Sequence, residues 1–128
     1  CRVAAMTDVT GFGLARHALN LAARCGFSGV HLTLDDIPLL AGAAELSASG
    51  IASSLRDGNM RAVPEQHIAP DLAPEKTALL FDPQTSGGVL AAIPSTDAEP
   101  VIAALARLEG GLAVRIGRFT SVSGLTLS

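Results

Sequence analysis

Two short segments of the chain combine carboxylates, hydroxyls and glycines in patterns that suit the binding of anions or of a divalent cation. The first segment runs from Met6 to Gly13 and reads Met-Thr-Asp-Val-Thr-Gly-Phe-Gly. Asp8 could be a hard oxygen ligand for Mg²⁺, which usually takes one or two carboxylates together with phosphate oxygens. The start of a helix after the glycines would offer free N–H groups to an anion. On residue types alone the plainer interpretation, that Asp8 or Thr10 caps this helix, is preferred.

The second segment, Asp82 to Gly88, reads Asp-Pro-Gln-Thr-Ser-Gly-Gly and leads into an apolar run. A loop of this composition can form an anion-binding nest or a simple turn, and residue types favour the turn. The sequence contains none of the general motifs G-x-x-x-x-G-K-[ST], H-E-x-x-H, G-x-S-x-G or G-x-G-x-x-G. His17, His31 and His67 are isolated, so we interpret them as structural or solvated and assign them no chemistry.

Hydrophobic periodicity predicts the elements that hold the two segments. A helix is expected from Gly13 to Arg24, with one apolar face that includes Cys25, and Gly26 should end it. Val30, Leu32 and Leu34 alternate with polar residues, which predicts a strand with one buried face. A short Ala-rich helix is expected from Leu39 to Ser49, closed by Gly50.

The second half of the chain is less regular. The stretch from Ile51 to Pro74 shows no clean period and is divided by Pro64, Pro70 and Pro74, and Ser53 to Asn59 has the composition of a turn. Val89 to Ile93 is predicted to form a central strand that is covered on both faces. A helix is predicted to follow, capped by Ser95 or Thr96 and with Pro100 in its first turn. A terminal strand pair is predicted from Leu112 to Ile116 and from Leu125 to Leu127. We therefore predict an α+β fold in which helices pack on a mixed β-sheet.

Composition limits the classes of function. The 128 residues fit one domain, with 48% hydrophobic residues and a net charge of −3. Few aromatic residues and scattered arginines argue against a nucleic-acid partner. No apolar run approaches the ~20 residues that cross a membrane. Cys1 and Cys25 form no disulfide framework or metal spacing, so we expect a cytoplasmic setting. Lacking an initiator Met, the chain is expected to begin within a longer protein.

The two segments together resemble a known family. Thr7 to His17 resembles the T-D-V-T-G-F-G-L-x-G-H signature of selenophosphate synthetases (selenide, water dikinases), except at Arg16, and Asp82 to Gly88 is identical to their D-P-Q-T-S-G-G signature. Weaker likenesses to the family occur at Asp36 to Ala43 and at Arg115 to Gly117. The resemblance covers nearly the whole chain, and it places residues 1–128 as a carboxy-terminal domain within the aminoimidazole ribonucleotide synthetase superfamily, without the ATP-binding amino-terminal domain.

The resemblance implies an enzyme that makes selenophosphate, AMP and phosphate from ATP, selenide and water, and that needs Mg²⁺. It implies that Asp8 binds the metal together with aspartates of the amino-terminal domain. It also implies a loop-shaping or phosphate-proximal role for Thr7, Thr10, Gly11, Gly13, Asn59, Asp82, Gln84, Thr85, Ser86, Gly87 and Gly88. By the same resemblance, the reactive Cys or selenocysteine and its Lys are expected in the amino-terminal domain, so Cys1 is not expected to be the nucleophile and this part alone is expected to be inactive.

The resemblance also raises expectations about the parent protein. A homodimer is expected, and the domain should begin with a strand and a helix upstream of Cys1. Where many members have a G-G-T-x-x-N loop, this chain has Ser53-Ser54-Leu55-Arg56-Asp57-Gly58-Asn59, a variant similar to members fused to a flavin-dependent dehydrogenase-like domain. Two alternatives stay open: another ATP-dependent enzyme of the superfamily, and a non-catalytic interaction or regulatory module that has kept the fold.

Overall fold

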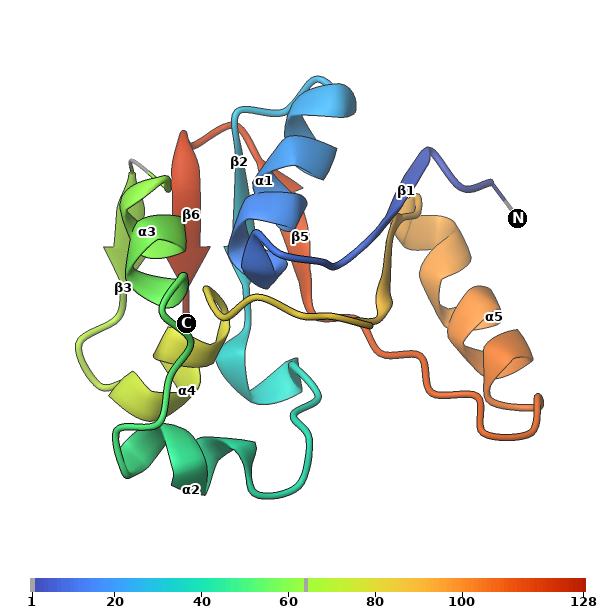
Figure 1. The fold of residues 1–128 in the computed structure, drawn as a ribbon. Coiled ribbons are helices and arrows are strands. Elements are labelled where there is room, and N and C mark those ends of the chain that lie inside the picture. The colour runs from blue at the N-terminus through green and yellow to red at the C-terminus, as the bar shows by residue number, and fades with distance from the viewer. Residues whose placement is uncertain (1, 64) are drawn as a thin grey trace.

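Two β-sheets and five α-helices make up the part of the chain that the computed structural model describes, residues 2–63 and 65–128 (Figure 1). Cys1, which was expected not to be the nucleophile, and Pro64, which was expected to divide an irregular stretch, lie outside the described residues. Helices and a mixed sheet occur in one domain, so the predicted α+β class is confirmed.

The larger sheet has four strands in the order β3-β6-β2-β5. β2 (Gly29–Leu32) pairs antiparallel with β5 (Gly117–Thr120) and parallel with β6 (Gly124–Leu127), and β3 (Gln66–Ile68) pairs parallel with β6. The predicted terminal strand pair is therefore wrong. β5 and β6 are close in sequence but flank β2 on opposite sides, because β6 inserts between β2 and β3 through long-range pairing that no local pattern encodes.

The main core lies between α1 (Gly13–Arg24) and this sheet. Alternation along the strands directs one face of the sheet toward the helix, and the predicted apolar face of α1 lies against it. The buried side chains are Leu14, Ala15, Ala18 and Leu21 of the helix and Val30, Leu32, Leu125 and Leu127 of the sheet. Gly26 follows the helix with φ +82°, a left-handed conformation that ends it as predicted.

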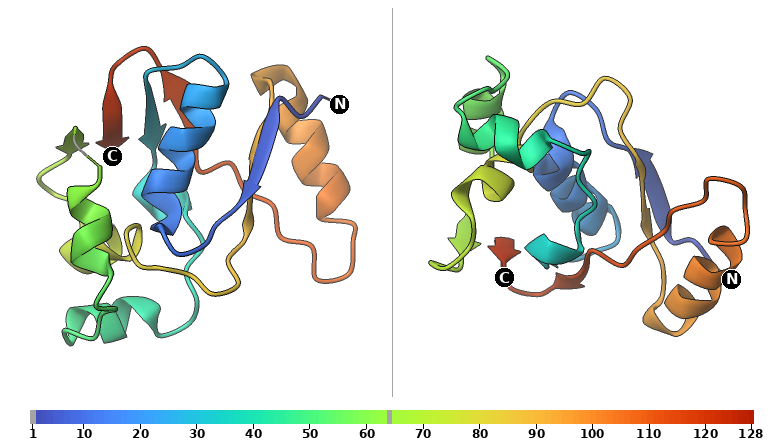
Figure 2. Two further views of the ribbon diagram at one scale, coloured as in Figure 1. Left: turned by 45° about the horizontal axis from the view of Figure 1, so that its top comes forward. Right: turned by 90° about the horizontal axis from the view of Figure 1, so that it is seen from below.

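The smaller sheet is an antiparallel ribbon of β1 (Ala5–Asp8) and β4 (Val89–Ala92), which lies beside the main core next to α5 (Ser95–Leu105) (Figures 1 and 2). The prediction of a central, doubly covered strand at Val89 to Ile93 is wrong, since Val89 is 69% exposed. An apolar run reports the hydrophobicity of a strand but not its place in a sheet. Met6 of β1 is likewise 66% exposed.

Three short helices complete the fold: α2 (Ala43–Ala48), α3 (Arg56–Arg61) and α4 (Pro74–Leu79). The predicted helix from Leu39 to Ser49 is thus shorter, since it starts after Gly42, whose φ is +82°. The stretch from Ile51 to Pro74 is not irregular throughout, because it contains α3 and β3. Neither element has enough residues for a periodic pattern to be visible in the sequence.

Several predicted element ends differ from the structure. Leu34 belongs to a 3₁₀ turn (Leu34–Asp36) and not to β2. α5 begins at Ser95 behind Pro94 with no capping side chain, and Pro100 lies inside the helix instead of in its first turn. These errors concern ends and caps, where sequence patterns are weakest. The strand predicted from Leu112 to Ile116 is a larger error, because those residues form no strand and β5 begins only at Gly117.

Candidate functional site

The two sequence motifs meet at one surface. The ribbon pairing places Asp8 opposite Val89, and beyond the ribbon the Val9 N–H donates to the Gly88 carbonyl at 2.9 Å. The Gln84 N–H donates to the Thr10 carbonyl at 3.1 Å. The segment that follows β1 and the segment that precedes β4 therefore form one structural unit, although they are far apart in the sequence.

Asn59 of α3 links both segments through its side chain. Its Nδ2 group donates to the Gly11 carbonyl and to the Phe81 carbonyl, each at 2.9 Å. Because the amide carries two N–H bonds, each carbonyl can receive its own hydrogen bond. The side chain of Asn59 therefore joins the first segment to the chain just before the second segment, and α3, which presents it, follows directly after the Ser53–Ser54 departure.

Two of the motif glycines are required by close backbone approach. Gly13 has φ +73°, and a Cβ there would lie 2.8 Å from the Leu80 carbonyl oxygen. A Cβ at Gly87 would overlap the Val9 carbonyl and the Gln84 side chain. In contrast, a Cβ at Gly11 or Gly88 would meet no atom within 4 Å. Gly87 is therefore needed where the two motif loops meet, and Gly13 is needed where the first motif meets the chain just before the second.

Asp8 ends β1 with an exposed side chain. No described residue forms a hydrogen bond or an ion pair with its carboxylate, and only its backbone carbonyl is engaged, by the Thr7 hydroxyl at 3.1 Å. The capping interpretation is wrong, because Phe12 occupies the N-cap position of α1 and no side chain caps it. The carboxylate is therefore free to bind a ligand.

The carboxylate of Asp8 fits a magnesium ion as one ligand among several. Mg²⁺ prefers oxygen and commonly uses one or two protein carboxylates, and Asp8 is exposed and unpaired among the described residues. Residues 2–63 and 65–128 contain no group of three or more His, Cys, Asp or Glu side chains that could hold a metal. Asp8 would thus be a contributor to a metal site and not the centre of a complete one.

His17 contacts the first segment, although it is isolated in the sequence and we expected no role for it. The Thr10 N–H donates to His17 Nε2 at 3.1 Å, and the Thr10 hydroxyl oxygen lies 3.2 Å from the same nitrogen. The His17 ring also lies beside Phe12, with 6.0 Å between ring centroids. The position of His17 early in the predicted helix could have indicated this contact, because side chains in the first turns of a helix point back toward its N-terminus, where the first segment lies.

The remaining predicted residues of the second segment are less engaged. Asp82 is half-buried, and within the described chain its Oδ1 is a buried oxygen that has no hydrogen-bond partner. Gln84 contributes its backbone N–H to the junction, whereas Thr85 and Ser86 are exposed. The structure thus brings Thr10, Gly13, Asn59, Gln84 and Gly87 into one network and leaves Asp8, Thr85 and Ser86 open to solvent.

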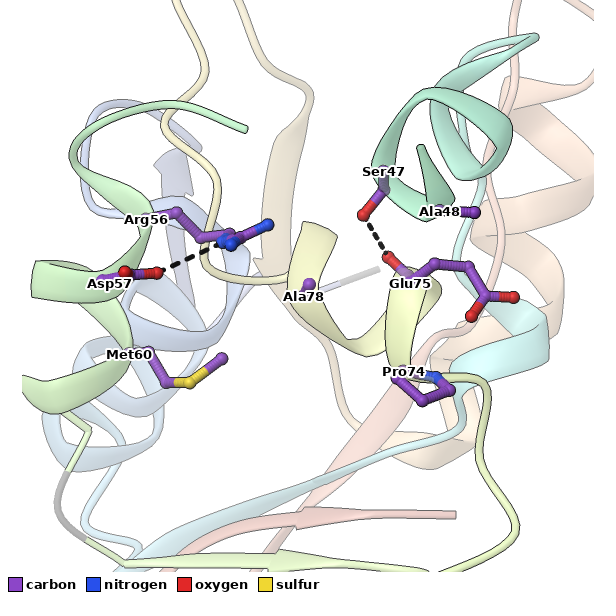
Figure 3. A pocket seen from close by; sticks show the side chains of 8 residues that line it. All are labelled: Ser47, Ala48, Arg56, Asp57, Met60, Pro74, Glu75 and Ala78. Atoms are coloured by element: carbon purple, nitrogen blue, oxygen red, sulfur yellow. Dashed lines mark hydrogen bonds and ion pairs between the residues drawn. The ribbon is translucent and has the colours of Figure 1, made fainter. Parts of the chain in front are cut away.

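A separate groove of about 490 Å³ lies between α2, α3 and α4 (Figure 3). It is lined by Ser47, Ala48, Arg56, Asp57, Met60, Pro74, Glu75 and Ala78. Arg56 and Asp57 pair at 3.4 Å, and the Ser47 hydroxyl donates to the Glu75 carbonyl at 2.9 Å. Because its polar groups bond with one another and it includes no residue of either motif, we do not assign the site to this groove.

Comparison with known families identifies the fold. Residues 2–128 match the family described as AIR synthase related protein, C-terminal domain. The chain belongs to this family. Solved structures agree: this AIR synthase-related domain is similar to the E. coli hydrogenase maturation protein HypE, with a TM-score of 0.64 and 23% identity over 98% of this chain and 31% of that chain. At that identity the likeness concerns the fold alone.

Curated relatives that are more similar in sequence include several selenide, water dikinases. The domain is 40% identical over 124 residues to the selenide, water dikinase of Salmonella typhi, covering 95% of this chain and 34% of the relative. It is 41% identical over 95 residues to the selenide, water dikinase of Nitratidesulfovibrio vulgaris, covering 72% and 26%. The resemblance inferred from the two motifs is confirmed. The chain spans about a third or less of the length of these relatives.

No helix among its described residues is long and apolar enough to cross a membrane.

Proposed function

We propose that this domain is the carboxy-terminal part of a selenide, water dikinase, which forms selenophosphate, AMP and phosphate from ATP, selenide and water. In this proposal Asp8 supplies one ligand to Mg²⁺, and the two motif loops form one wall of a site shared with an ATP-binding amino-terminal domain. The observation that carries the proposal is the hydrogen-bonded junction of the two motifs, with the unpaired carboxylate of Asp8 exposed at its edge.

The surroundings of Asp8 support a site between two domains. Met6, Val89 and Phe12 are 66%, 69% and 61% exposed, and they lie on the segments that flank Asp8. Exposed apolar side chains gathered around a polar group are typical of a surface that another domain covers. An amino-terminal domain placed there would bury this apolar surface and bring its own carboxylates toward Asp8.

The roles of the residues follow from this geometry. Mg²⁺, when bound, neutralises charge on the phosphate oxygens of ATP. Asp8 would supply one carboxylate ligand to the ion. Gly87 lets the second motif loop approach Val9 closely, and Gly13 does the same for the first motif against Leu80 and Phe81. Asn59 keeps the two loops at a fixed separation. The nucleophile is supplied by the other domain.

The experiment is the substitution Asp8→Asn in the protein that carries both domains. Losing a metal-ligating carboxylate should lower selenide-dependent AMP formation by at least about 100-fold, since even outer groups of metal sites contribute 10–100-fold. Asp71→Asn, which changes another exposed carboxylate away from both motifs, is the matched control and should retain activity. Circular dichroism should be unchanged in both variants. Near-normal turnover of Asp8→Asn would remove Asp8 from the metal site.

A further inference from the structure

Thr10 is the junction through which α1 and both motif loops are connected. Its carbonyl accepts hydrogen bonds from the Gly13 N–H at 3.0 Å and from the Gln84 N–H at 3.1 Å. Its N–H donates to His17 Nε2 at 3.1 Å. Because Thr10 follows Asp8 by two residues, the orientation of the Thr10 peptide groups controls how the chain leaves β1.

We propose that His17 is a positioning residue for the Asp8–Gly13 loop and that it acts through an unprotonated Nε2. The proposal rests on the proposed function, because it concerns the same loop. His17 touches neither metal nor substrate in this scheme. By holding Thr10, His17 orients the backbone that presents Asp8 and the Thr10 carbonyl that accepts a hydrogen bond from Gln84 of the second motif.

The hydrogen-bond pattern determines which ring nitrogen carries the proton. A backbone N–H can only donate, so Nε2 must present a lone pair to Thr10, and the ring proton of the neutral imidazole then resides on Nδ1. The Thr10 hydroxyl, 3.2 Å from Nε2, can share the same lone pair. In the opposite tautomer the Thr10 N–H would lose its partner in a partly buried position, which carries the full desolvation cost of that group.

The ring is also held by its neighbours. His17 is half-buried on α1, and the Phe12 ring lies at a tilt of 47° to it. Neither of the other histidines makes this kind of contact: His31 Nε2 meets the Ser128 hydroxyl at 2.8 Å, and His67 is exposed on β3. Contact with a backbone N–H of a motif loop therefore distinguishes His17 from His31 and His67.

The first test is spectroscopic and does not depend on catalysis. Nitrogen-15 NMR of the histidine rings in the two-domain protein should show Nδ1 of His17 protonated and Nε2 unprotonated. A proton found on Nε2 in the neutral ring would overturn the proposal. This measurement uses the unmodified protein, so it holds even if a variant fails to fold.

The second test uses a pair of substitutions at one position. His17→Phe keeps a ring beside Phe12 but removes the acceptor, whereas His17→Gln keeps an acceptor at a similar reach. In the two-domain protein, His17→Phe should make the Thr10 amide exchange with solvent about tenfold faster, as expected for one lost hydrogen bond. His17→Gln should restore most of the protection. Unchanged exchange in His17→Phe would contradict the proposal.

Steady-state kinetics with Mg²⁺-ATP complete the test. Because a displaced ligand loop weakens binding of the metal and its nucleotide, His17→Phe should raise the KM for Mg²⁺-ATP by about 10-fold or more, with a smaller change in kcat and with rescue by His17→Gln. His67→Phe is the control and should change neither parameter. If the unmodified protein forms no selenide-dependent AMP, the proposed function fails, while the tautomer and exchange results still decide the role of His17.

Discussion

Removing the side-chain amide of Asn59 should destabilise the domain and release both motif loops. Asn59→Ala deletes two neutral hydrogen bonds, each worth about 0.5–1.5 kcal/mol, and the bond to Gly11 lies on the exposed side and belongs to the low end of that range. Alanine regains up to about 0.7 kcal/mol of helix propensity in α3. The two bonds together contribute about 1–2 kcal/mol, so after the gain in helix propensity the free energy of unfolding should fall by about 0.3–1.3 kcal/mol.

Chemical denaturation with circular dichroism measures this change, and hydrogen exchange locates it. Asn20→Ala is the matched control, since Asn20 is an exposed asparagine within α1 and the same substitution should leave stability unchanged or raise it by a few tenths of a kcal/mol. In Asn59→Ala, residues 9–13 and 82–88 should lose protection together. Equal stability changes in the two variants, or protection lost from only one loop, would refute the linking role of Asn59.

Two further predictions concern the second motif and the larger sheet. Gly87→Ala should lower the free energy of unfolding by about 1–3 kcal/mol, because its Cβ would overlap the Val9 carbonyl, whereas the neighbouring Gly88→Ala should be tolerated; equal thermal midpoints would contradict this packing. Burial, and secondarily the charge of Arg118, lowers the pKa of His31 below its ordinary value of 6.5. The unfolded chain therefore binds a proton at His31 more readily than the folded chain does, so the free energy of unfolding should fall as the pH drops below 6.5. His31→Gln should flatten that part of the stability profile, and an unchanged slope would assign it to other groups.

Local patterns predicted the elements whose burial is one-sided. The helix from Gly13 to Arg24 and the strand around Val30 to Leu32 were found because one apolar face packs into the core and because Gly26 ends the helix. The insertion of β6 between β2 and β3 could not be found, since it depends on pairings between distant segments. The exposure of Val89 could not be predicted either, because an apolar run is typical both of a strand inside a sheet and of a surface that another domain covers.

The candidate site was predicted mainly by family resemblance. Residue types alone favoured interpreting Asp8 or Thr10 as a helix cap and Asp82 to Gly88 as a simple turn. Only the match of both motifs to the signatures of one family indicated a shared site. The structure then showed three contacts that the motif sequences do not contain: the contact between the motifs, the two hydrogen bonds of Asn59, and the hydrogen bond that His17 accepts from Thr10. These interactions join residues from separate elements, and a linear pattern carries no record of them.

The proposed site is shared between this domain and an ATP-binding domain. Isothermal titration of ATP with Mg²⁺ into this chain and, in parallel, into the two-domain protein tests it most directly. Since Asp8 alone supplies only one ligand, we expect saturable binding to the two-domain protein and no measurable tight binding to this chain. Tight binding of ATP by this chain alone would contradict it.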